Sequence, residues 1–131
     1  GSLPLGNLQI GYLTENYAQR SSVFSWVQVT GDTNITFSSG FICSGATGIV
    51  NLTLPTGASI GNYFKATAKT ASGFKITQNS GQVIYFGQAN STTGISGYLQ
   101  NTLNRDNIEI VCATANTEFQ VISSIGNFNL I

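Results

Sequence analysis

Residues 63 to 69, Tyr63-Phe64-Lys65-Ala66-Thr67-Ala68-Lys69, alternate strictly between apolar and polar positions once Tyr63 is counted as amphipathic. Neighbouring side chains of a β-strand point to opposite faces, so this stretch places Phe64, Ala66 and Ala68 together on one face. The other face then carries Tyr63, Lys65, Thr67 and Lys69. The pattern predicts a half-buried strand whose two lysines point to solvent.

The segments on either side follow the same period of two. The run from Val50 to Leu54 alternates and stops at Pro55-Thr56-Gly57, a turn sequence. Phe74 to Thr77 alternates, and Asn79-Ser80-Gly81 separates it from the apolar run Val83 to Phe86. Further strands are expected over 108–112, 119–122 and 128–131.

Short strands at such close spacing, nine or ten in all, are typical of an antiparallel β-sandwich or barrel-like domain. Turn sequences such as Asn79-Ser80-Gly81 are expected to form hairpins. Helical spacing occurs only over Leu13 to Trp26, where Arg20-Ser21-Ser22 interrupts it. The predicted fold class is therefore all-β.

The composition describes one domain with an unusual surface. The 131 residues include 15 Thr, 14 Ser, 13 Asn and 15 Gly, whereas only 8% are charged. Because an ordinary domain is about 25% charged, the polarity of this surface must come from short neutral side chains. A hydrophobic content of 41% is enough to form a core.

The composition also argues against several functions. The chain has no His, which removes imidazole bases and the usual zinc ligands. Its five carboxylates are scattered, and the net charge is zero, which disfavours a nucleic-acid partner. No apolar run approaches the roughly 20 residues of a membrane span. We expect no enzymatic activity, no cofactor, no metal, no nucleic-acid partner and no membrane insertion.

Three local features leave alternatives open. Cys43 and Cys112 lie in apolar stretches. They form either two buried thiols or a single disulfide, and the sequence alone does not choose between these states. The apolar terminal segments pack on their own sheet or bury against identical chains in an oligomer. The opening Gly1-Ser2 is interpreted as a cloning scar, so the chain is expected to come from a larger protein.

Several motifs of the second half together resemble a known type of domain. They are Leu52-Thr53-Leu54-Pro55, the run from Gly73 to Gln82, Phe86-Gly87, and the closing segments 115–119 and 123–127. The combination resembles the C-terminal head domain of bacterial collagen-like surface adhesins and bacteriophage tail-fibre proteins. The resemblance covers residues 40–131. Residues 1–39 are expected to lead from a stalk into this head and to form one domain with it.

The resemblance implies a homotrimeric, β-rich head at the end of a fibrous stalk, located extracellularly, at the cell surface or at a virion fibre tip. Its implied function is attachment to polysaccharides, including sulfated ones. It brings no catalytic residues, and it does not distinguish an adhesin from a phage fibre. A structural trimerisation cap, or a fibre tip that recognises a neutral glycan, is the alternative function.

The basic residues form the candidate binding site. Three of the five basic residues fall between Lys65 and Lys75, and no acidic residue lies between Asp32 and Asp106. In a trimer, each basic residue occurs three times, so one long anionic polymer can contact several copies at once. Such a repeated basic surface suits a sulfated glycosaminoglycan. Its residues would be Lys65, Lys69, Lys75, Arg105 and Arg20.

Two other interpretations of these residues stay open at the level of sequence. The lysines are also what a solvated strand edge carries to discourage aggregation. A neutral sugar would instead stack on Tyr63, Tyr85 or Tyr98, although tyrosines on strands usually pack as cross-strand pairs.

Overall fold

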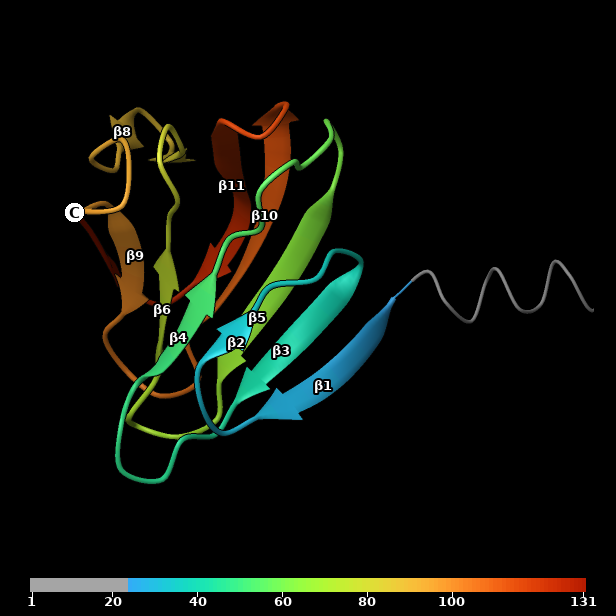
Figure 1. Ribbon diagram of the computed structural model, residues 1–131. Helices are drawn as coiled ribbons and strands as arrows, with labels where there is room; N and C mark the ends of the chain where they lie inside the picture. Colours follow the sequence, from blue (N-terminus) through green and yellow to red (C-terminus); the bar gives the residue numbers. More distant parts are fainter. Residues whose placement is uncertain (1–23) are drawn as a thin grey trace, which may run out of the picture.

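The computed structural model describes residues 24–131, which form an all-β fold of two mixed sheets, as in a β-sandwich (Figure 1). Hydrogen-bonded neighbours of the larger sheet follow the order β1 (Ser25–Val29), β3 (Ser39–Cys43), β5 (Tyr63–Ala68), β10 (Asn107–Thr114), β11 (Glu118–Ile125), β7 (Val83–Phe86) and β8 (Ala89–Asn90). The smaller sheet follows the order β12 (Phe128–Leu130), β9 (Tyr98–Asn101), β6 (Phe74–Thr77), β4 (Val50–Thr53) and β2 (Thr33–Asn34).

The all-β prediction is confirmed, but the prediction of antiparallel sheets is wrong. Five of the ten strand pairings in the described residues are parallel: β1 with β3, β3 with β5, β2 with β4, β4 with β6, and β7 with β11. Both sheets are therefore mixed.

The parallel pairings arise because the chain changes sheet at successive turns. From β1 to β6, odd-numbered strands belong to the larger sheet and even-numbered strands to the smaller one. The chain reverses its direction twice before it returns to the same sheet. Each new strand therefore runs parallel to the previous strand of that sheet. Asn79-Ser80-Gly81, expected to form a hairpin, instead leads from β6 in one sheet to β7 in the other.

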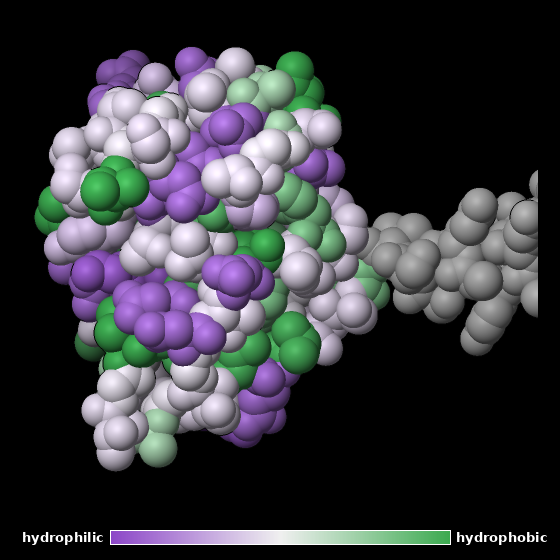
Figure 2. Space-filling model, in the orientation of Figure 1, coloured by the Kyte–Doolittle hydropathy of each residue, from purple (hydrophilic) through white to green (hydrophobic). Residues whose placement is uncertain are grey.

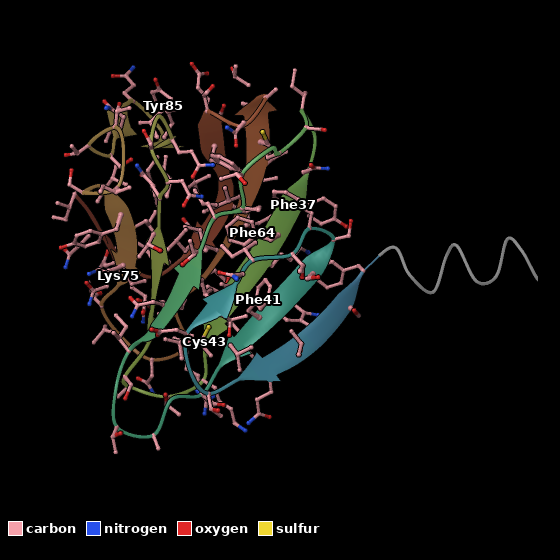
Figure 3. The ribbon with its side chains drawn as sticks, viewed as in Figure 1. Phe37, Phe41, Cys43, Phe64, Lys75 and Tyr85 are labelled. Atoms are coloured by element: carbon pink, nitrogen blue, oxygen red, sulfur yellow. The ribbon has the colours of Figure 1, made fainter. Side chains whose placement is uncertain are left out.

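The hydrophobic core lies between the sheets and draws on both. Phe41, Phe64 and Phe119 of the larger sheet pack in one buried cluster with Leu52 and Ile76 of the smaller one (Figure 3 labels Phe41 and Phe64). The predicted alternation of residues 63–68 is confirmed, because β5 alternates between half-buried and buried side chains. The polar positions of β5 therefore form part of the outer face of the larger sheet.

The two cysteines are buried free thiols and form no disulfide. Cys43 lies on β3 and Cys112 on β10, with β5 between these strands. Burial raises the pKa of Cys43 to about 12, so this thiol stays protonated near neutral pH. Both cysteines act as small core residues.

The described parts of the two terminal segments join the same two sheets. Phe128 and Leu130 pack against the core, so the end of the chain packs on its own sheet. Ser25 and Trp26, at the end of the segment with helical spacing, belong to β1, whereas residues 13–23 of that segment lie outside the described residues. The strands β1 and β2 place residues 25–29 and 33–34 in the same two sheets as the rest of the described residues.

Candidate functional site

Two of the predicted basic residues, Lys65 and Lys69, lie on the strand β5 and directly after it. Lys65 lies on the outer face of the larger sheet, and Lys69 comes directly after the end of β5. The backbone N–H of Lys69 still donates to the carbonyl of Cys43 at 2.9 Å, which continues the pairing of β3 with β5. Four residues of extended chain span about 13 Å.

Arg105 lies at the same end of the larger sheet as Lys69. It occupies the turn before β10 with φ 74°, and its backbone N–H donates to the carbonyl of Ala68 at 2.6 Å. Ala68 directly precedes Lys69, so the turn carrying Arg105 is held beside Lys69. We name Lys65, Lys69 and Arg105 the basic stripe.

Lys75 is not part of this stripe, because it lies on β6 of the smaller sheet (Figure 3). Its Nζ is 4.0 Å from the centroid of the Tyr98 ring on the neighbouring strand β9. A cation over an aromatic face is a favourable arrangement, and here it covers one face of a tyrosine considered for sugar stacking. Arg20 lies outside the described residues.

Lys65 lies within a row of cross-strand neighbours on the outer face of the larger sheet. The registers of four successive pairings align Trp26, Gly40, Lys65, Glu109 and Ser123 on β1, β3, β5, β10 and β11. The adjacent row contains Ile42, Thr67, Asn107 and Ile125. These rows bring together residues that are up to 97 positions apart in the sequence, from Trp26 to Ser123.

A shallow groove of about 330 Å³ follows this row. Its lining residues are Trp26, Lys65, Thr67, Asn107, Ile108, Glu109 and Ser123. Lys65 is the member of the predicted site that contributes to this groove. We name this feature the Trp26 groove.

The indole of Trp26 forms one wall of the groove, and the absence of a side chain at Gly40 makes its position possible. A Cβ added to Gly40 would lie 2.4 Å from Cε3 and 2.6 Å from both Cδ2 and Cζ3 of Trp26. Near-equal distances to three ring atoms mean that Gly40 meets the flat side of the indole. Trp26 is nevertheless 50% exposed.

Other aromatic rings hold this region together. The Phe24 ring meets Trp26 edge to face with centroids 5.4 Å apart, and it lies parallel to the Tyr63 ring at 6.1 Å. The Lys65 Nζ is 5.2 Å from the centroid of the Phe24 ring. Aromatic pairs in such geometries add about 0.5–1.5 kcal/mol each beyond area burial. The cluster therefore restrains both Trp26 and Lys65.

The groove combines one cation with one anion. Lys65 and Glu109 are direct cross-strand partners, flanked by the neutral hydrogen-bonding groups of Thr67, Asn107 and Ser123. An ammonium group only donates hydrogen bonds, whereas a carboxylate only accepts them. The groove can therefore hold an anionic group at one position and hydroxyl groups beside it.

Sequence reasoning missed Trp26, Gly40 and Glu109 as members of a site. They come from three strands whose neighbours could be identified only from the sheet order and register. The available signal was that the chain has a single Trp, in a segment without a clear strand rhythm. Asp106, close to Glu109 in the sequence, is buried, and its carboxylate Oδ2 accepts hydrogen bonds from the N–H groups of Thr102 and Leu103.

On the side that Figure 2 shows, hydrophilic and hydrophobic areas alternate among weakly polar residues. Within residues 24–131, no group of three or more His, Cys, Asp or Glu side chains could hold a metal ion. The same residues include no helix long and apolar enough to cross a membrane.

No model of a known protein family matches the chain, and no curated protein matches it either.

Proposed function

We propose that this domain is a non-enzymatic attachment head that binds an anionic polysaccharide, with sulfated glycosaminoglycans as the favoured ligands. The observation that carries the proposal is the basic stripe, in which Lys65 lies on the outer face of the larger sheet and Lys69 and the turn carrying Arg105 lie side by side at the end of the same strand. We further propose an extracellular location at the end of a longer surface protein, as the resemblance to adhesin heads and tail fibres implies.

The stripe suits an extended polymer better than a single small anion. Lys65 and Lys69 are about 13 Å apart along the strand direction, so different units of one chain would meet them. The lysines act as point charges, while the guanidinium of Arg105 can hold a sulfate or carboxylate with two hydrogen bonds. Lys69 and Arg105 are exposed and Lys65 is half-buried, so salt weakens each contact and affinity depends on several contacts at once.

Exposed apolar side chains support the proposal that the head is a homotrimer. Ile122 on β11 is 52% exposed, and Leu103 is 62% exposed. Residues of this kind favour burial against another copy of the chain. We expect sedimentation to give a solution mass three times the 13.8 kDa of one chain. The mass of a single chain at micromolar concentration would contradict the trimer.

A salt series on immobilised heparin or chondroitin sulfate tests the attachment function. We expect retention at low salt that falls steeply as ionic strength rises, because exposed charge contacts are screened. A neutral polysaccharide matrix is the control and should retain little protein. Absence of retention on the sulfated matrices at low salt would contradict anionic recognition and favour the structural cap or a neutral-glycan tip.

A further inference from the structure

We infer that the Trp26 groove is a subsite for a sugar ring that carries a single negative charge, as a uronic acid does. This inference rests on the proposed function and makes it more specific. The basic stripe supplies general attraction for a polyanion, whereas the groove selects the chemistry of one unit of the polymer. The argument has three steps, which concern the indole, the charges and the hydrogen-bonding groups.

The indole offers a flat surface for a sugar ring. One side of its six-membered ring rests on Gly40, and the side chain is still 50% exposed. The C–H groups of a pyranose form apolar patches that pack on an aromatic face. Because Gly40 and Phe24 already fix the indole, little conformational entropy is lost when a ligand stacks on it.

The two charges of the groove favour a ligand unit with one anionic group. Lys65 and Glu109 are cross-strand partners, on strands about 4.8 Å apart. A carboxylate beside Lys65 gains a charge-assisted hydrogen bond. A second anionic group on the same ring would be forced toward the Glu109 carboxylate, where like charges repel. Rings with several sulfates are therefore disfavoured in this groove.

The remaining lining residues suit the hydroxyl groups of such a ring. Glu109 accepts hydrogen bonds from hydroxyls, and Thr67, Asn107 and Ser123 both donate and accept them. The groove volume of about 330 Å³ lies at the lower end of the range for small-molecule sites. A single ring of a longer chain fits this scale, and neighbouring units would continue toward Lys69 and Arg105.

The test uses the fact that Trp26 is the single Trp of the chain, so tryptophan fluorescence reports on this groove alone. The full chain is titrated with alginate oligosaccharides, which are polyuronates without sulfate, and separately with dextran sulfate and neutral dextran. We expect a saturable change in Trp26 emission with alginate and none with neutral dextran. No change with alginate at any concentration that binds would contradict the subsite.

Two variants separate the subsite from general attraction. Trp26→Ala, whose binding is measured by calorimetry because it removes the single Trp, is expected to weaken alginate binding about tenfold and dextran sulfate binding by less than about twofold. Glu109→Gln removes the repulsive charge without removing the indole, so it should raise the affinity for dextran sulfate relative to alginate. Equal changes for both polymers would overturn the inference while leaving the proposed function intact. Failure of the unmodified chain to bind either polymer would contradict both.

Discussion

Lys65→Glu is expected to weaken heparin binding at low salt about a hundredfold. The substitution removes a charge-assisted hydrogen bond, worth about 1.5–3 kcal/mol, and places a repulsive carboxylate in the groove. A loss of about 2.7 kcal/mol corresponds to a hundredfold change in affinity. Lys65 lies on the outer face and is half-buried, so the core is left unchanged. Retention and titration on heparin at fixed ionic strength measure the effect.

Lys75→Glu is the matched control, since it makes the same change of charge on the opposite sheet. We expect it to weaken binding by less than about threefold, because Lys75 is outside the basic stripe. Equal losses for the two variants would mean that the overall charge, rather than a local site, binds the polymer.

Two further variants complete the comparison. Glu at position 65 stands directly opposite Glu109, which adds a small penalty to folding. Lys65→Gln avoids this penalty and should still weaken binding about tenfold. The double variant Lys65→Glu with Lys69→Glu is expected to abolish retention while its thermal unfolding stays cooperative. Retention of the folded double variant would contradict the role of the stripe.

The sequence predicted single strands well because alternation is a local property. The buried positions Phe64, Ala66 and Ala68 follow from the period of two within β5. The partners of a strand depend instead on where each turn leads. Pro55-Thr56-Gly57 has the composition of a hairpin turn, yet it lies between β4 of the smaller sheet and β5 of the larger one. Turn residues alone do not distinguish these two outcomes.

The local nature of alternation also explains which parts of the site could be predicted. The outward-facing position of Lys65 on β5 follows from alternation. The hydrogen bond from the Arg105 N–H to the carbonyl of Ala68, which holds the turn of Arg105 beside Lys69, does not. Lys75 is only six residues after Lys69 in the sequence, but the intervening turn moves it to the other sheet. Trp26 comes near Lys65 only through the parallel pairings of β1 with β3 and of β3 with β5. Glu109 comes beside Lys65 only through the antiparallel pairing of β5 with β10.

Gly40→Ala is expected to displace the indole of Trp26 and to weaken alginate binding about tenfold, as far as Trp26→Ala does. The added Cβ would lie 2.4–2.6 Å from three ring atoms, a distance too short for carbon atoms in contact. Gly40 is fixed on both sides by pairing with β1 and β5, so the side chain of Trp26 must move instead. We expect its emission to shift to longer wavelength as the ring becomes more exposed.

Gly31→Ala is the control for this substitution, because a Cβ at Gly31 has no atom within 4 Å. Gly31 follows β1 in the chain, so the control tests whether a small change near β1 alone affects binding.

Alanine is more favourable than glycine in a strand by about 0.5–1 kcal/mol, which offsets part of the lost packing at position 40. Gly40→Ala should therefore stay folded, and unchanged Trp26 emission together with unchanged alginate binding would show that the indole does not rest on Gly40. In that case the stacking surface would be lost from the proposal, and the basic stripe would have to account for polysaccharide binding by charge alone.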